Sequence, residues 1–507
     1  MSIDPTKIKI ESHHPAIWEH EDDFGQIMSE QLKHAPWLAL SLLAHLVVLL
    51  IAWVLLDEPR DNRDLLALQM DQQEEEEDIE EEVEEVEEVV EEDVIEEEVQ
   101  EEEITEDEIM ENITDENITD TVESAFDSDG WNTAVGLGGG AGGKWGGRQG
   151  GRKALESKNR GAARAIDDGL QWLKDHQDDD GRWDADGFMK HDTTGAPSDD
   201  AGLPIHDVGV TALALLAYLG DGSTMRGGPY QDQVKEAVKW LRKQQGSSGL
   251  FGTDNSSNYI YDHAIATYAM CEAYGLSKYA TLRKNAEKGL AYLESHRNPY
   301  AVWRYQPRDG DNDLSVTGWC IMAYKSAEGF GLEVNTKAME YSMDYLDKLT
   351  DPNNGRAGYQ EMGQPSSREP GDHSTRFPPE KGEAMTAVGL FCRFFLGQNH
   401  KDPENEVMRK AADTILSKPP TGAKDGSIDH YYWYYASYAL YQMGGSHWTQ
   451  WSRALDSAVV KVQRSDGNFK GSWDADGAWG ENGGRVYSTA ILVLTLEAFY
   501  RYTALIR

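Results

Sequence analysis

Three segments of the chain share one spacing of apolar, glutamine, glycine and aromatic residues. They read Leu173-x3-Gln177-x3-Gly181-x-Trp183, Leu241-x3-Gln245-x3-Gly249-x-Phe251 and Val459-x3-Gln463-x3-Gly467-x-Phe469. Looser copies occupy residues 289–305, 342–360 and 411–427, which makes six units. Internal repeats of this kind indicate a fold in which each unit buries its apolar surface only against its neighbours.

Each unit contains two helical patterns of different character. The first is amphipathic, as in AIDDGLQWLKDHQ (165–177), and the second is apolar nearly all round, as in DVGVTALALLAYLG (207–220). A helix that is apolar on every side must be covered on every side, whereas an amphipathic helix can meet water. We therefore predict a mostly α protein in which residues 154–507 form a single (α/α)6 toroid, with six inner helices inside six outer ones.

The repeated spacing resembles the QW motif of squalene and oxidosqualene cyclases, and residues 154–507 resemble the prenyltransferase/squalene-cyclase repeat fold. In such repeats the glutamine can tie the ends of neighbouring helices together, while the aromatic ring stacks over the turn. The motif therefore specifies a fold strongly and a chemistry weakly.

Charge divides the chain into two parts. Residues 1–143 hold 43 acids and 5 bases, whereas residues 144–507 hold 47 acids and 42 bases. Neither part offers the dense Lys/Arg footprint that nucleic-acid binding needs. Cys271, Cys320 and Cys392 lie in apolar stretches without CxxC spacing, so we expect three buried thiols, with no disulfide framework and no cysteine metal site. Nothing in the sequence identifies a cofactor.

Four segments are predicted before the toroid. They are a polar segment (1–36), a transmembrane helix (37–56), an acidic arm (57–135) and a glycine-rich linker (136–153). Residues 37–56 read WLALSLLAHLVVLLIAWVLL, twenty residues without a formal charge, enough to cross a hydrocarbon core of about 30 Å. Residues 74–123 carry 29 acids, whose mutual repulsion favours an extended arm that becomes helical when a basic partner neutralises it.

Ser41 and His45 lie four residues apart, and hence on one face of the predicted transmembrane helix. An imidazole in hydrocarbon is costly unless it faces protein, which favours a partner helix over a neutral histidine tolerated in a lone span. Ser41-x-x-x-His45 resembles the anchor of TonB-type energy transducers, whose serine and histidine face the ExbB/ExbD motor. That resemblance implies a bacterial inner-membrane protein with a single span and a periplasmic C-terminal domain. The flanking Lys and Arg residues give no orientation of their own.

Ionisable residues recur at the starts of the inner helices, which a toroid gathers at one rim of its cavity. The rim candidates are His206, Asp207, Asp262, His263, Glu383, Asp429, His430 and Tyr487. The aspartates at helix starts, Asp207 and Asp313, could simply cap free N–H groups. The His–Asp neighbours are harder to explain by capping and could bind a metal or form an acid/base cluster.

The cyclase family protonates a polyprene with an aspartic acid in a D-x-D-D-T-A motif. Its counterpart here is Asp311-Asn312-Asp313-Leu314-Ser315, so the resemblance places Asp311 and Asp313 at the motif's first and third positions and makes Asp313 the proton donor. Leu314 and Ser315 depart from the motif. Residues 431–435 offer five aromatic rings, which could stabilise carbocations or simply pack the core.

Three functions remain open from the sequence. The first is a membrane-anchored binding or scaffold module, coupled through its anchor to an ExbB/ExbD-type motor. The alternative is an enzyme that processes isoprenoids, and the third is a carbohydrate-active α/α barrel with carboxylates drawn from Asp262, Asp313, Glu383 and Asp429. An enzyme that processes isoprenoids would take an apolar ligand, and a carbohydrate-active barrel would take a glycan. The zinc motif D-x-C of protein prenyltransferases and the CGEQ thioester motif are both absent.

Overall fold

The computed structural model describes residues 147–369 and 371–501 of the chain. The predicted polar segment, transmembrane helix and acidic arm, with Ser41 and His45, lie outside these residues. Within the described ranges, no helix combines the length and the apolar composition needed to cross a membrane. The same ranges contain isolated β-bridges, such as Gln245 with Phe251, but no named strand.

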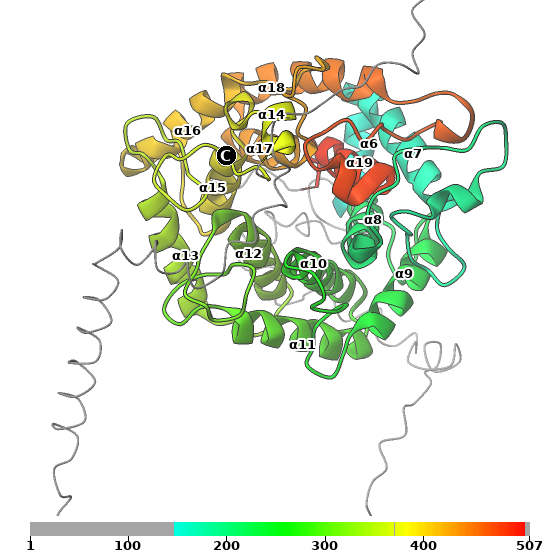
Figure 1. Cartoon of the computed structure of the whole chain (residues 1–507), viewed down its shortest axis with the longest axis horizontal. Coiled ribbons are helices and arrows are strands. Elements are labelled where there is room, and N and C mark those ends of the chain that lie inside the picture. The colour runs from blue at the N-terminus through cyan, green and yellow to red at the C-terminus, as the bar shows by residue number, and fades with distance from the viewer. Residues whose placement is uncertain (1–146, 370, 502–507) are drawn as a thin grey trace, which may run out of the picture. The chain divides into compact units, whose positions relative to one another are not determined.

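Two concentric rings of helices make up the described part of the chain (Figure 1). The inner helices are α8 (Asp207–Asp221), α10 (Tyr259–Ser277), α12 (Leu314–Gly329), α15 (Ala384–Phe395), α17 (His430–Met443) and α19 (Gly480–Glu497). The outer helices are α7 (Arg160–Asp175), α9 (Gln231–Gln244), α11 (Ala280–His296), α13 (Thr336–Leu349), α16 (Glu406–Leu416) and α18 (Gly445–Ala458). Each inner helix packs on the next, and α19 packs on α8, so the ring closes. The predicted α/α toroid is confirmed.

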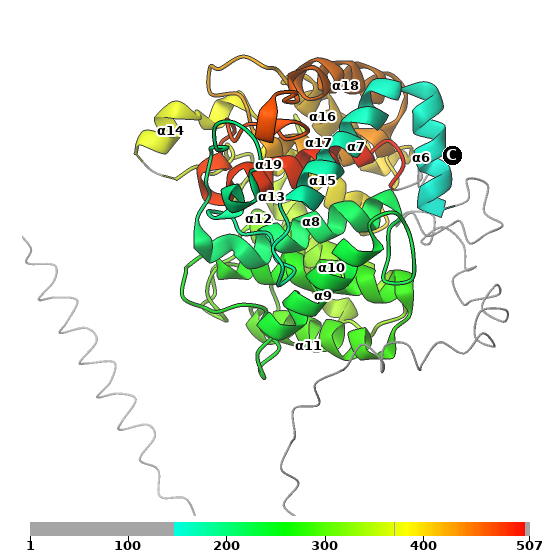
Figure 2. The same ribbon diagram turned by 90° about the vertical axis from the view of Figure 1, so that its right-hand side faces the viewer.

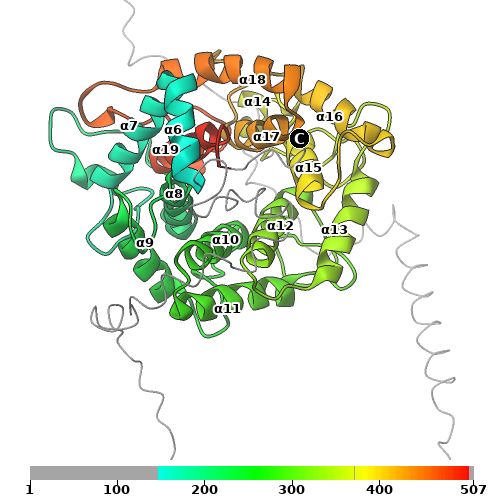
Figure 3. The same ribbon diagram turned by 180° about the vertical axis from the view of Figure 1, so that it is seen from behind.

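Short elements complete the toroid. They are α6 (Gly147–Lys158), α14 (Asp372–Arg376) and the 3-10 turns η5 (Phe188–His191), η6 (Pro204–His206), η7 (Pro379–Lys381), η8 (Pro403–Asn405), η9 (Val460–Val462) and η10 (Gly467–Phe469). Figure 2 and Figure 3 place α6 and α14 at opposite ends of the toroid. The starts of the inner helices lie at the α14 end.

The outer helices are displaced by one unit relative to the inner ones. Each packs more closely on the inner helix of the preceding unit than on the inner helix that follows it: α9 lies on α8, α11 on α10, and α7 on α19. A unit of the sequence is therefore not a compact unit in space. The turn that follows each outer helix therefore leads from the inner helix on which that outer helix packs to the next inner helix of the ring.

The repeated glutamines span these crossings. Gln177 Nε2 donates to the oxygens of Gly181 (2.9 Å) and of Gln233 on α9 (3.1 Å). Gln245 Nε2 does the same with Gly249 (3.1 Å) and with Asn285 on α11 (2.9 Å). One side chain thus holds a turn to the next outer helix, as the motif predicts.

The third predicted copy of the motif has the wrong register. Gln463 Nε2 donates to the oxygen of Gly471 (2.8 Å), not Gly467, and the buried ring beneath the turn is Trp473, whose Nε1 donates to Val459 O (2.8 Å). A Cβ on Gly471 would come within 2.1 Å of Asp168 O, whereas one on Gly467 would meet nothing within 4 Å. This turn is four residues longer, and the extra residues form η10, which includes the half-buried Phe469.

The toroid begins earlier than predicted, because α6 starts at Gly147, within the segment expected to be a flexible linker. Arg152 Nε donates to Asp221 Oδ1 at the end of α8 (3.0 Å). A Cβ on Gly151 would lie 2.7 Å from Tyr500 Cβ, so this glycine permits close packing of α6 instead of giving the linker freedom.

Charged groups are also buried where the ring closes. Arg501 bonds Glu272 and Glu497, each at 2.7 Å, and all three side chains are fully buried. Removal of one partner would leave an uncompensated charge in the interior. The three cysteines are buried free thiols, as predicted.

Candidate functional site

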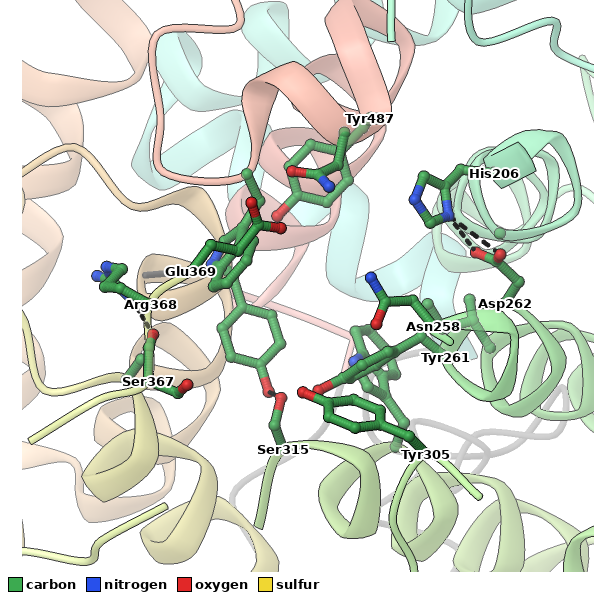
Figure 4. A pocket seen from close by; sticks show the side chains of 18 of the residues that line it. His206, Asn258, Tyr261, Asp262, Tyr305, Ser315, Ser367, Arg368, Glu369 and Tyr487 are labelled. Carbon is green, nitrogen blue, oxygen red and sulfur yellow. Dashed lines mark hydrogen bonds and ion pairs between the residues drawn. The ribbon is translucent and has the colours of Figure 1, made fainter. Parts of the chain in front are cut away.

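A cavity of about 500 Å³ lies within the inner ring, at the end where the inner helices begin. Residues near the start of each inner helix line it, α19 being counted from its kink at Gly484: Gly209, Tyr261, Ser315, Ala384, Tyr431 and Tyr487. One turn deeper, Leu213, Ile265 and Trp319 continue the wall. The wall is therefore mainly apolar and aromatic, with polar groups around its opening (Figure 4).

Only one of the five aromatic residues 431–435 lines the cavity. Tyr431 faces it, and its hydroxyl lies 2.9 Å from Ser315 Oγ. Trp319, also in the wall, stacks on Tyr434 with ring centroids 5.7 Å apart. Residues 432–435 are buried in the core behind the wall. Core packing is therefore confirmed for residues 432–435, and stabilisation of a cation by Tyr431 stays a prediction.

His206 and Asp262 form a pair in the cavity wall. His206 ends η6, Asp262 lies in the first turn of α10, and His206 Nδ1 lies 3.1 Å from Asp262 Oδ2 and 3.3 Å from Oδ1. A Cβ on Gly209 of α8 would lie 2.1 Å from Asp262 Oδ1, so only glycine leaves room for this carboxylate. Burial opposes the imidazolium, but hydrogen bonding and attraction to Asp262 raise the pKa of His206.

Asp313 does not line the cavity, although the cyclase resemblance makes it the proton donor. It is fully buried, and its Oδ1 accepts from Val316 N (2.8 Å) as the N-cap of α12. Its Oδ2 accepts from Tyr359 Oη (3.2 Å), and Tyr359 Oη lies 2.6 Å from Tyr305 Oη. Both tyrosines line the cavity. Burial raises the pKa of Asp313 to about 7, despite the opposing effects of Val316 N–H and Arg304.

Asp311 and Asp207 lie outside the cavity lining, and each pairs with an arginine. The Asp311 carboxylate is exposed and pairs with Arg304. Asp207 Oδ1 accepts from Ala185 N (2.9 Å), and Arg182 Nη1 donates to its Oδ2 (2.9 Å). Burial raises the pKa of Asp207 to about 6.

Asp207 also belongs to an acidic cluster outside the cavity. Oxygens of Asp184, Asp186 and Asp207 lie within 4.8 Å of one another. Arg182 and Lys190 lie 3.3 and 3.0 Å from Asp184 Oδ2, so cationic side chains already neutralise part of the cluster. We read this as an ion-pair network.

His263 has a structural position. Its Nδ1 accepts from Phe251 N (3.0 Å), and its Nε2 donates to Gly289 O (3.2 Å). Thr211 Oγ1 holds the corresponding place in the first unit and accepts from Trp183 N (2.9 Å). Burial lowers the pKa of His263 to about 3, so this histidine is a neutral bridge between the turn and the neighbouring outer helix.

The remaining rim candidates in units four and five also lie outside the cavity lining. Asp429 caps α17 through Tyr432 N (3.0 Å) and pairs with Arg368 (2.6 Å), while Glu383 pairs with Arg356 (2.6 Å) and Lys418 (2.7 Å). His430 is buried, and desolvation lowers its pKa to about 4.

Tyr487, by contrast, lines the cavity. Its phenol oxygen is buried and has no hydrogen-bond partner among the described residues. A ligand with a polar group could satisfy that oxygen.

Several lining residues could not be singled out from the sequence. Tyr305 and Arg304 follow α11, and Tyr359 follows α13, all in turns between an outer and an inner helix. Their only signal is position: Tyr305 and Tyr359 lie two residues after Trp303 and Ala357, the residues that occupy the aromatic position of the motif. An aromatic residue two positions after the aromatic position of the motif is therefore the sequence signal that could have pointed to Tyr305 and Tyr359.

Part of the chain is similar in sequence to a known enzyme. No protein-family model matches the chain. A squalene–hopene cyclase from Bradyrhizobium diazoefficiens is 26% identical over 199 residues, which are 36% of this chain and 28% of the relative. The chain thus matches well under half of that cyclase. This partial similarity agrees with the resemblance of the QW-type turns to those of squalene cyclases, and the fold of the described residues is an α/α toroid.

Solved structures of similar shape include a terpene cyclase and an epimerase. The type II terpene cyclase MstE from Scytonema has a TM-score of 0.43 at 14% identity, covering 67% of this chain and 97% of that chain. Cellobiose 2-epimerase from Bacillus thermoamylovorans has a TM-score of 0.47 at 13% identity, covering 68% and 99%. Residues 37–56 lie outside the described part, so their resemblance to a TonB-type anchor stays a prediction.

Proposed function

We propose that the toroid is an enzyme of the squalene-cyclase-like class that binds an isoprenoid chain in its central cavity. The observation that carries this proposal is the wall of the cavity, where Tyr261, Trp319 and Tyr431 present aromatic rings beside Leu213 and Ile265. A volume of about 500 Å³ suits a small-molecule ligand. Apolar side chains favour a hydrocarbon, and π faces favour any cationic carbon that forms on it.

The carbohydrate function has less support. Hydrolysis of a glycosidic bond commonly needs two carboxylates flanking one bond. Among the lining residues only Asp262 and Glu369 are carboxylates, and Asp262 is engaged by His206. Asp313, Glu383 and Asp429, the other carboxylates expected for this function, are absent from the lining.

An enzymatic function is favoured over the scaffold function because the cavity has an acid within reach. A general acid works best when its pKa lies near the operating pH, and burial brings the pKa of Asp313 to about 7. The phenols of Tyr359 and Tyr305 connect this carboxyl to the cavity through hydrogen bonds of 3.2 and 2.6 Å. When its carboxyl is protonated, Asp313 would donate to Tyr359 Oη instead of accepting from it, and so supply a proton through the tyrosines and not by direct contact.

The test is incubation of the purified full chain with squalene and with geranylgeraniol, followed by native mass spectrometry and product analysis. We expect a bound isoprenoid and a product isomeric with it. Trp319→Ala should weaken binding, and Asp313→Asn should abolish the product without preventing binding. The matched control is Tyr300→Ala, since Tyr300 is an aromatic residue with 83% exposure, outside the cavity.

Each alternative predicts a different result. Isoprenoid bound and never converted, in wild type as in Asp313→Asn, would restore the binding-module function. A co-purified glycan with no isoprenoid would favour the carbohydrate function. Membrane anchoring through residues 37–56, and coupling of Ser41 and His45 to an ExbB/ExbD-type motor, remain separate proposals; crosslinking of wild type and His45→Leu in membranes would test them.

A further inference from the structure

We propose that His206 is the proton acceptor of the cavity, with Nε2 as the accepting atom and Asp262 as the residue that positions it. This inference rests on the proposed function, because it assigns a second step to the same cavity. Nothing in the comparisons assigns a role to either residue.

The orientation of the imidazole leaves Nε2 of His206 free to accept a proton. Both oxygens of Asp262 lie within 3.3 Å of His206 Nδ1, so the neutral ring carries its proton on Nδ1 and leaves Nε2 with a free lone pair. Figure 4 shows Asp262 on one side of the ring and the second ring nitrogen turned toward the cavity. No described residue forms a hydrogen bond with that nitrogen. A neutral imidazole held in this way is a general base.

Residues from three units of the toroid hold the His206–Asp262 pair in place. The Asp262 carboxylate fits in its place only because Gly209 on α8 has no side chain. The segment that leads to His206 is held by unit six, since Leu203 N donates to Asn482 O (2.8 Å) and Arg485 Nη2 donates to Asp200 Oδ2 (2.8 Å). His206 is therefore fixed by the closure of the ring and not by its own short 3-10 turn.

The charges around His206 favour its protonated form. The charged groups around His206 are Asp262 on α10 and the adjacent Asp207, and Arg182 neutralises Asp207 at 2.9 Å. The carboxylate of Asp262 stabilises the imidazolium once Nε2 has taken a proton. The His206 side chain keeps 12% of its surface exposed, so the proton can pass on to solvent.

The proton transfer to His206 leaves the atoms and electrons of the ligand balanced. When a carbon of the bound chain is cationic, His206 Nε2 forms an N–H bond with a hydrogen on the neighbouring carbon. The C–H bond breaks, its electron pair becomes a double bond, and the cation is discharged. One proton enters from Asp313 and one leaves at His206, so the product is an isomer of the substrate and no further reactant is required.

Two variants and one control test the inference on the full chain. His206→Gln removes the base, and Asp262→Asn keeps the shape but removes the charge. His447→Gln is the control, because His447 on α18 also meets a carboxylate, Asp413, at 2.8 Å, but outside the cavity. We expect isoprenoid binding in all three, at least a 100-fold loss of product formation in His206→Gln, and wild-type activity in His447→Gln.

The pH profile separates positioning from packing. Activity of the wild type should fall at low pH as His206 becomes protonated. Asp262→Asn lowers the pKa of His206, so its acidic limb should move to lower pH, whereas a merely structural role of Asp262 would lower the rate without moving the limb.

The same shift should appear without substrate, as a lower pKa in the 15N spectrum of histidine-labelled Asp262→Asn protein. If wild type converts an isoprenoid and His206→Gln does so equally well, the inference is wrong and the proposed function stands. If wild type neither binds nor converts isoprenoids, the proposed function fails and the inference fails with it.

Discussion

The two sides of the inner helices differ in how far they keep the repeat. On the side that meets the turns, Thr211, Thr317, Thr386 and Thr489 all accept the N–H of the turn residue, with distances from 2.9 to 3.4 Å. On the cavity side, the equivalent position changes from glycine to tyrosine, serine and alanine. Four of the six inner helices thus meet the turn backbone with the same side chain, and His263 accepts the same N–H in the second unit, whereas a ligand meets each helix differently. Chemistry is therefore to be sought where the repeat is broken.

The largest effect is expected on the turn side. Trp473→Ala removes a nearly fully buried ring and its bond to Val459 O, and should cost about 3–5 kcal/mol of unfolding free energy. Phe469→Ala, in the same turn, should cost less than about 1 kcal/mol, because Phe469 is only half-buried. Urea denaturation measures both. A larger loss for Phe469 would show that the register Gly467-x-Phe469 is correct after all.

A pH-dependent effect should follow at Asp313, which lies between the two sides. Burial raises the pKa of Asp313 to about 7 in the folded protein, against about 3.9 for an unperturbed aspartate, so the folded state holds a proton that the unfolded state has released. Wild-type stability should therefore fall as the pH rises from about 4 to 7.

Asp313→Asn keeps a capping oxygen and lacks this titration. Relative to wild type it should gain stability across that range, by about 4 kcal/mol at most. Denaturation at pH 5 and at pH 8 gives the comparison. A constant difference between the two proteins would show that Asp313 titrates normally.

A smaller effect is expected for one repeated glutamine. Gln245→Ala removes the donor to Gly249 O and Asn285 O, and should cost about 1–2 kcal/mol, because it leaves Gly249 O and the side-chain amide of Asn285 without this partner. Gln171→Ala is the control, since Gln171 bonds Asp175 on the exposed face of α7, and it should change stability by less than about 0.5 kcal/mol. Thermal unfolding of the two variants side by side would reveal whether the motif stabilises more than a surface pair does.

The smallest effect on stability belongs to the cavity side. Tyr487→Phe removes a hydroxyl without a hydrogen-bond partner among the described residues, so unfolding free energy should change by less than about 0.5 kcal/mol. Isoprenoid affinity should fall about 3–10-fold if that hydroxyl bonds the ligand. Titration calorimetry with geranylgeraniol measures this. A stability loss as large as that of Trp473→Ala would assign Tyr487 to the core.

The sequence predicts the fold well because the fold depends on the repeat. Periodicity and the glutamine spacing are enough to predict the inner and outer helices and the bridging role of Gln177 and Gln245. They fail at Gln463, since a spacing cannot reveal that a turn has gained four residues when another glycine and aromatic stand in the expected places. They also fail at α6, where Gly151 provides room for packing and not flexibility.

The candidate site is predicted less well, because which side of a helix faces the cavity is a property of packing. Asp313 and His263 stand at helix starts as expected, but both side chains bond backbone N–H groups behind the cavity wall and do not line the cavity. His206 and Asp262 are brought together from different units by Gly209, whose importance is invisible in a stretch of apolar residues. Tyr359 and Tyr305 come from turns, which carry no periodic signal.

The displacement of the outer helices sets an order of events during synthesis. The helix α7 leaves the ribosome among the first, but its inner partner is α19, the last inner helix to be made. A Cβ on Gly169 would lie 2.6 Å from Val493 Cγ2, so α7 and α19 pack closely, and Gln463 Nε2 donates to Ala165 O of α7 (2.8 Å). Until residue 493 has emerged, the part of α7 that packs on α19 stays uncovered and open to misassembly. In a toroid of this architecture, the first outer helix cannot complete its packing before the last inner helix has been made.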